Sequence, residues 1–119
     1  MKRRVFISYA AADKALAEAA VRELGARGYL SEDNTIFTPQ DMAVGEHIRQ
    51  RLKSEIEAAD MVIVVMSEEA ARSQWVNYEV GMADALGKKI LVVGRKGSGK
   101  SALLANLAEY QHVELEGSG

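Results

Sequence analysis

The stretch Met61-Val62-Ile63-Val64-Val65-Met66 decides the fold of this chain. Its residues are apolar at consecutive positions, which predicts a strand that is buried on both faces. Strands of this kind lie in the middle of parallel sheets, because helices cover both faces of such a sheet. The expected fold class is therefore α/β.

Strands and helices alternate on either side of this stretch. The expected strands cover residues 5–9, 29–37, 61–66, 89–93 and 112–115. Apolar residues at helical spacing predict the helices between them. The first helix contains Leu16, Ala20 and Leu24 and ends at Gly25 and Gly28; the second contains Ile48, Leu52 and Ile56; the third runs to about Leu86; the fourth covers residues 102–110.

This alternation predicts right-handed crossovers and one parallel sheet that is covered on both sides. The simplest arrangement is a doubly wound, flavodoxin-like sheet of five strands in the order 2-1-3-4-5. A length of 119 residues is typical of one domain. We assign residues 1–116 to that domain and interpret residues 117–119, Gly-Ser-Gly, as a linker stub.

Composition and charge limit the possible functions. Apolar residues make up 48% of the chain and charged residues 27%, as in a folded globular protein. The formal net charge of −2 argues against nucleic acid as a partner, and no apolar run is long enough to span a membrane. The absence of cysteine fits a reducing cytoplasm. His47 and His112 are isolated, so no metal site is predicted.

The expected architecture also predicts where a ligand would bind. Open parallel sheets bind ligands beyond the carboxyl ends of their strands, where the strand order reverses. In this chain that point lies between the first and third strands. The loops at residues 8–13, 38–45 and 67–73 are expected to meet there.

Glu79 lies in the middle of the apolar side of the third helix. At about 100° per residue, the apolar residues within about 60° of it are Trp75, Val76, Met82, Ala83 and Leu86. Asn77 and Asp84 lie on the opposite side, where a solvent-facing acid belongs. If the helix begins after a short turn, with Ser73 as its N-cap, Glu79 lies about 9 Å along it and close to the predicted site. With Ser67 as the N-cap, the helix would start earlier, and Glu79 would lie further along it and further from the predicted site.

Two interpretations of this carboxylate remain open. One is a structural glutamate whose carboxylate reaches solvent or a buried partner. The other is a functional group that stabilises a developing positive charge, an attraction of about 4 kcal/mol at about 4 Å before desolvation costs. Cleavage of a glycosidic bond creates such a charge on the sugar. Trp75, one helical turn earlier, either stacks on a base or belongs to the core.

Four segments resemble the Toll/interleukin-1 receptor (TIR) domain family, and especially its short bacterial members. Residues 5–9 resemble the first strand of that family, residues 38–45 its second loop, and residues 61–67 its central strand ending in serine. Residues 73–79 resemble its Ser-x-Trp-x-x-x-Glu segment, which is the most specific of the four matches. The resemblance spans nearly the whole chain.

The resemblance implies an NAD+ glycohydrolase in which Glu79 cleaves the nicotinamide–ribose bond, with cyclisation as a further outcome. NAD+ is then the substrate, and no cofactor is expected. The substrate-binding residues would be Ser8, Tyr9, Phe37 and Trp75.

The resemblance further implies an effector that is activated by self-assembly, as in bacterial antiphage defence, and that works with a sensor domain or partner protein. The assembly loop would contain Pro39, Asp41, Met42, Val44 and Gly45. Met42 and Val44 are apolar and have no periodic place in either flanking element, which favours a contact with a second copy.

Two other functions remain open. The first is a non-catalytic TIR adaptor that acts by homotypic association. The second is a nucleoside hydrolase or deoxyribosyltransferase, because residues 78–89 also resemble the nucleoside deoxyribosyltransferases, which use a glutamate on a related fold. A carboxylate within an apolar helix face favours an enzyme over a scaffold.

Residues 94–101, Gly-Arg-Lys-Gly-Ser-Gly-Lys-Ser, match the phosphate-binding pattern G-x-x-x-x-G-K-[ST]. A nucleotide hydrolase needs a sheet built mostly after this motif, and only residues 113–115 remain for a strand. No acidic residue follows at the end of a later apolar strand to hold a metal ion. We therefore interpret the segment as a glycine-rich, basic surface loop.

Overall fold

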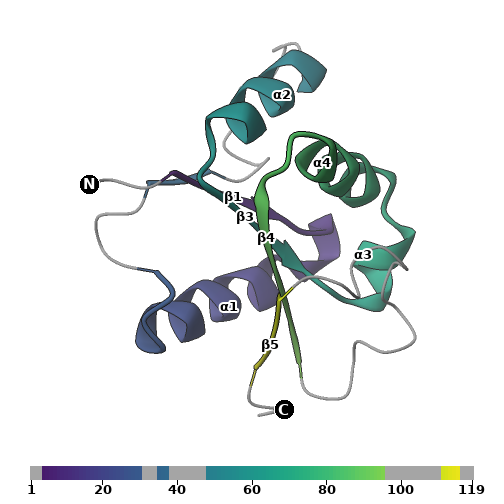
Figure 1. Cartoon of the computed structure of the whole chain (residues 1–119). Helices are drawn as coiled ribbons and strands as arrows, with labels where there is room; N and C mark the ends of the chain where they lie inside the picture. The colour runs from purple at the N-terminus through teal and green to yellow at the C-terminus, as the bar shows by residue number, and fades with distance from the viewer. Residues whose placement is uncertain (1–3, 31–34, 38–47, 96–110, 116–119) are drawn as a thin grey trace.

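The computed structural model describes residues 4–30, 35–37, 48–95 and 111–115. Within these ranges strands and helices alternate along the chain (Figure 1). The elements in order are β1 Arg4–Ser8, the short 3-10 helix η1 Ala11–Asp13, α1 Lys14–Ala26, β2 Thr35–Phe37, α2 Ile48–Ala58, β3 Met61–Val65, α3 Glu68–Arg72, α4 Gln74–Ala85, β4 Lys89–Arg95 and β5 Gln111–Leu115.

The strands form one five-stranded sheet in the order β2-β1-β3-β4-β5, and each pair of neighbours is parallel. The predicted α/β class with a parallel sheet is therefore confirmed. In the centre of the sheet, Ile63 of β3 pairs with Ile7 of β1 on one side and with Leu91 of β4 on the other. Because Ser8 pairs with Val64, β1 and β3 reach the same edge of the sheet together.

Every residue of β3 is buried, as its unbroken apolar run predicts. Val62 and Val64 belong to one half of the hydrophobic core, and Met61, Ile63 and Val65 belong to the other half. Successive side chains of a strand point to opposite faces, so β3 contributes to both halves. The sheet is thus covered on both sides.

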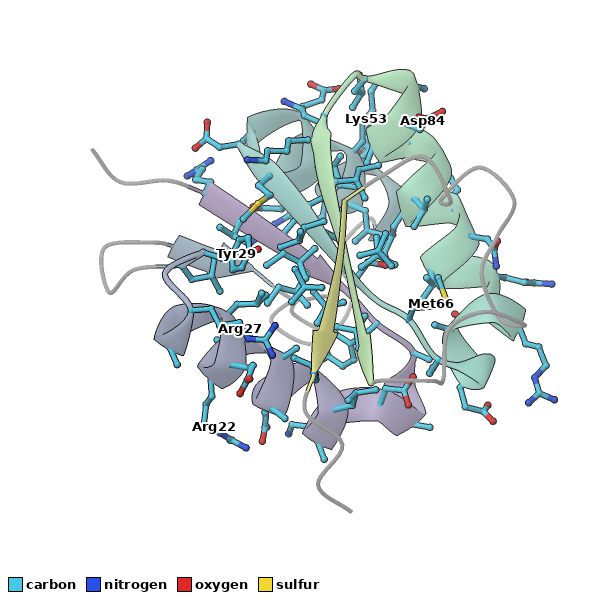
Figure 2. All side chains as sticks on the ribbon, turned by 60° about the horizontal axis from the view of Figure 1, so that its bottom comes forward. Arg22, Arg27, Tyr29, Lys53, Met66 and Asp84 are labelled. Carbon is cyan, nitrogen blue, oxygen red and sulfur yellow. The ribbon has the colours of Figure 1, made fainter. Side chains whose placement is uncertain are left out.

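Helix α1 covers one face of the sheet, and α2, α3 and α4 cover the other (Figure 1). The buried helix residues on the α1 face are Ala17, Ala20 and Leu24. Those on the opposite face are Leu52, Ile56, Ala70, Val76, Val80 and Ala83. The labelled side chains in Figure 2 mark the same layers. Arg22 and Arg27 lie on the α1 side of the sheet, and Lys53 and Asp84 lie on the opposite side.

The third predicted helix is divided into the short helix α3 and the longer helix α4. Both serines that were considered as N-caps are used, Ser67 for α3 and Ser73 for α4. The hydroxyl of Ser67 caps α3 by accepting a 2.9 Å hydrogen bond from the N–H of Ala70. The hydroxyl of Ser73 caps α4 by accepting a 3.2 Å hydrogen bond from the N–H of Val76. Leu86, which was expected on the apolar side, is instead 42% exposed because α4 ends at Ala85.

The second strand is shorter than the sequence predicts. Tyr29 and Leu30 were expected in it, but their N–H groups bond to the carbonyl of Leu24 at 2.9 and 3.3 Å and so close the end of α1. Gly28 permits this turn because its φ of +85° suits glycine best. In the described residues β2 is only Thr35–Phe37.

The other boundaries lie within one or two residues of the prediction. Helix α1 ends at Ala26, between the two glycines that were expected to end it. Strand β1 ends at Ser8, so that Tyr9 follows it. Strand β4 extends to Arg95, two residues beyond the predicted end, because β5 continues to pair with it there. The predicted helix at residues 102–110 lies outside the described residues.

Candidate active site

Ser8 of β1 and Glu79 of α4 meet inside the protein. The hydroxyl of Ser8 donates a 2.8 Å hydrogen bond to Oε1 of Glu79. Ser8 is 0% exposed and Glu79 is 1% exposed. Among the residues that the structure describes, these two carry the buried polar or charged side chains. The pair therefore forms a buried polar contact within a core whose other side chains are classed as hydrophobic.

Two elements bring this pair to the carboxyl edge of the sheet. Ser8 is the last residue of β1 and lies beside β3. Glu79 follows the N-cap Ser73 by about one and two-thirds helical turns and shares the buried face of α4 with Val76 and Val80. Its hydrogen bond to Ser8 places Glu79 at the end of β1, the point at which the strand order predicts a ligand site.

The surroundings of Glu79 change its acidity. Burial raises the pKa of its carboxyl group from 4.5 to about 7, and the hydrogen bond from Ser8 acts in the opposite direction. The raised pKa means that desolvation outweighs the single donor. Oε2 of Glu79 is also buried and has no hydrogen-bond partner within the described part of the chain. One carboxylate oxygen is thus hydrogen-bonded, and the other is buried without a partner among the described residues.

A second hydrogen bond joins two of the three loops that were expected at the site. The hydroxyl of Ser67, at the end of β3, donates to the carboxylate of Asp13 in η1. The same hydroxyl accepts the N–H of Ala70 and so begins α3. The third loop, at residues 38–45, lies outside the described residues.

The predicted substrate-binding residues occupy different places. Ser8 contacts Glu79, and Tyr9, which follows it, is 7% exposed. Phe37 ends β2 and pairs with Phe6, so β1 separates it from β3. Trp75 lies in the first turn of α4. The expected assembly residues Pro39, Asp41, Met42, Val44 and Gly45 all lie outside the described part.

Asp13 and Asn77 were not recognised from the sequence. Asp13 was expected only as the last residue of the loop at residues 8–13, although an acid in the first turn after a strand is a useful signal. Asn77 was placed on the solvent side of the helix, but its side-chain amide donates a 2.7 Å hydrogen bond to the carbonyl of Ser73. Both residues fix the loops that lead to Glu79.

The motif that resembles a phosphate-binding loop begins inside the sheet. Gly94 and Arg95 belong to β4 and pair with Glu114 and Leu115 of β5. The rest of the motif lies outside the described residues. No group of three potential metal ligands occurs within the described ranges. In the same ranges, no helix has the length and apolar character needed to cross a bilayer.

The family model of the TIR domain matches residues 5–118, and the chain therefore belongs to the TIR domain family. No curated protein sequence matches the chain significantly.

Several solved structures share the fold at low sequence identity. The TIR domain of the Toll-related receptor TRR-2 from Hydra magnipapillata has a TM-score of 0.68 and 18% identity over 91% of this chain and 82% of its own. The CMP N-glycosidase BcmB from Clostridium botulinum has a TM-score of 0.58 and 20% identity over 96% of this chain and 88% of its own.

A 2-desoxiribosyltransferase from Leishmania mexicana has a TM-score of 0.55 and 24% identity over 79% of this chain. This chain covers 65% of the length of that enzyme. At these identities the three likenesses describe the fold alone.

Proposed function

We propose that the chain is an NAD+ glycohydrolase that cleaves the bond between nicotinamide and ribose, with Glu79 as its catalytic residue. The observation that carries this proposal is the buried carboxylate of Glu79 at the carboxyl edge of the sheet, one oxygen of which has no partner among the residues that the structure describes. A buried acid with an unsatisfied oxygen costs stability, so a purely structural role does not account for it.

The chemistry requires little more than such a carboxylate. When the bond between the sugar carbon and nicotinamide breaks, the bonding electrons leave with the ring nitrogen and neutralise its positive charge. The sugar carbon becomes cationic, and an ionised carboxylate nearby stabilises it. Water then adds to that carbon and releases one proton, which gives ADP-ribose and nicotinamide. The leaving group is neutral, so no general acid is needed.

Two similar folds support activity on the bond between a sugar and a base. The Clostridium protein is described as a CMP N-glycosidase and the Leishmania protein as a 2-desoxiribosyltransferase. Both names refer to nucleoside chemistry rather than to adaptor function. A nucleoside hydrolase or deoxyribosyltransferase is therefore the second candidate, and it would use the same Glu79.

The burial of Glu79 supports a requirement for activation. With 1% of its surface exposed, Glu79 is closed to a dinucleotide in the conformation described. Cleavage needs a rearrangement that opens the carboxyl edge of the sheet. We propose that self-association of TIR copies provides it, in a cytoplasmic effector that responds to a sensor domain or partner protein, as in antiphage defence.

The test is the release of free nicotinamide from NAD+ by the concentrated protein. Glu79→Gln is expected to abolish release while keeping the fold. Asp84→Asn is the matched control, because Asp84 is an exposed acid on the same helix. Parallel reactions with CMP and with a deoxynucleoside plus a free base distinguish the second candidate. Equal release by wild type and Glu79→Gln would contradict the proposal.

A further inference from the structure

We infer that Ser8 is a positioning residue, which holds Oε1 of Glu79 so that Oε2 is the oxygen presented to the reacting sugar. The part of this inference that concerns the sugar rests on the proposed function. The part that concerns Glu79 itself rests on the structure alone and can be tested without any substrate.

The hydroxyl of Ser8 is already used inside the protein. It donates a 2.8 Å hydrogen bond to Oε1 of Glu79. A serine hydroxyl has one proton, so it cannot donate to a ligand while it donates to the carboxylate. Its backbone is held in the sheet, because Ser8 pairs with Val64 of β3. Ser8 is therefore a rigid donor, whereas the side chain of Glu79 has several rotatable bonds.

The pair lies on the α4 face of the sheet, where the core is apolar. The core half that contains the buried face of α4 also contains Leu52 and Ile56 from α2, Phe6 from β1, Val64 from β3, Ala70 from α3 and Val92 from β4. None of these can donate a hydrogen bond from its side chain. The hydrogen bond from Ser8 is thus the polar contact that the described residues provide to Glu79 in this apolar region.

The asymmetry of the carboxylate points to a use for the free oxygen. Buried polar atoms are nearly always hydrogen-bonded, and a structural carboxylate would be expected to have both oxygens satisfied. Within the described ranges, one oxygen of Glu79 has a donor and the other has none. A fixed Oε1 defines the direction of Oε2, which is the preorganisation that electrostatic catalysis requires.

The loss of the hydroxyl has a direct consequence for the protonation of Glu79. The hydrogen bond from Ser8 lowers the pKa of Glu79 against the larger effect of burial. Without it the ionised form loses its donor, and the pKa is expected to rise by about one to two units, the equivalent of a hydrogen bond to a charged group. At pH 7 the ionised fraction would then fall about fivefold or more.

The experiment compares Ser8→Ala, Ser8→Cys and Ser8→Thr in the full chain. Carbon NMR of labelled glutamate side chains follows the titration of Glu79. The signal of Glu79 is assigned as the one that is missing from the spectrum of Glu79→Gln. We expect the midpoint to rise by about one unit or more in Ser8→Ala and Ser8→Cys and to stay near the wild-type value in Ser8→Thr, which keeps the hydroxyl. Ser8→Cys keeps the shape of the side chain and replaces the hydroxyl with a weak donor, so it provides the comparison with Ser8→Thr if Ser8→Ala does not fold.

Activity gives a separate result. If wild type cleaves NAD+, kcat at pH 7 should fall about fivefold or more in Ser8→Cys, with KM within about twofold and the acid limb of the pH profile displaced upward. A Glu79 midpoint that is the same in wild type and in the folded Ala or Cys variants would overturn the inference. A change in KM alone would also overturn it, because it would make Ser8 a substrate contact. An inactive wild type would refute the proposed function, while the NMR titration would still decide the role of Ser8.

Discussion

Gly94 of β4 pairs with Glu114 of β5 and is therefore a strand residue. In a phosphate-binding loop the first glycine of the motif lies after the strand, where the backbone turns around the phosphates. Here the strand continues through Gly94 to Arg95. The match of residues 94–101 to that pattern is thus a likeness of sequence that the sheet does not support as a nucleotide site.

Lys100→Ala tests this interpretation. The substitution removes the lysine that a true phosphate-binding loop needs for its β- and γ-phosphates. We expect NAD+ turnover to remain within about twofold of wild type and no ATP hydrolysis in either protein. ATP hydrolysis by wild type that disappears in Lys100→Ala would contradict our interpretation.

Glu79→Gln should stabilise the protein in a pH-dependent way. The folded-state pKa of about 7 lies above the ordinary value of 4.5, so the folded chain retains the proton more strongly than the unfolded chain. The contribution of Glu79 to stability is then fully present below about pH 4.5 and is lost as the pH rises through about 7. Glutamine is neutral throughout and avoids this loss. The variant should exceed wild type by about 3 kcal/mol at pH 8 and by little near pH 5.

Urea unfolding at several pH values measures this difference. Asp84→Asn serves as the control, because it removes an exposed carboxylate from the same helix and leaves the buried one in place. Stability curves of wild type and Glu79→Gln that run parallel between pH 5 and 8 would show that the carboxylate is solvated in the folded state.

Ser73→Ala should weaken the start of α4. The hydroxyl of Ser73 accepts the N–H of Val76, and loss of an N-cap typically costs about 1 kcal/mol. Ser73→Asp keeps an acceptor at the cap and adds a negative charge at the helix N-terminus, so it should retain the stability of wild type. Chemical unfolding of the three proteins checks the order. An equal loss of stability in Ser73→Ala and Ser73→Asp would contradict the prediction, because it would show that an acceptor at the N-cap does not stabilise α4.

Activity should depend on self-association through the loop at residues 38–45. Turnover per molecule is expected to rise with protein concentration, because assembly follows mass action. Met42→Asp and Gly45→Glu should suppress this rise by placing a charge in the contact, with little change in melting temperature. A dilution series with parallel sedimentation provides the measurement. Constant turnover in a strictly monomeric sample would indicate a self-sufficient enzyme.

The central strand and the helix caps could be predicted because their signals are local. The apolar run of β3 needs two buried faces, and Ser67 and Ser73 each stand directly before a helical segment. The position of Glu79 on the apolar side followed from helical periodicity, and its burial agrees with it.

The partner of Glu79 could not be predicted in the same way. Its hydrogen bond joins residues 71 positions apart, and it depends on how α4 lies across the end of β1. Periodicity places a residue on a face but does not say which side chain it meets. The second strand was likewise expected to include Tyr29, although the turn after α1 uses that residue.

The separation of Ser8 and Glu79 along the chain also determines when the site can form during synthesis. The ribosome delivers residues in order, so Ser8 is present long before Glu79 has been added. Strand β3, which lies beside Ser8, also needs β4 on its other side, and β4 ends at Arg95. A domain folds as a unit, so a nascent or truncated chain that lacks α4 and β4 cannot complete the sheet. Such a chain also lacks Glu79, which belongs to α4. Any reaction that depends on Glu79 is therefore withheld until most of the protein has been made.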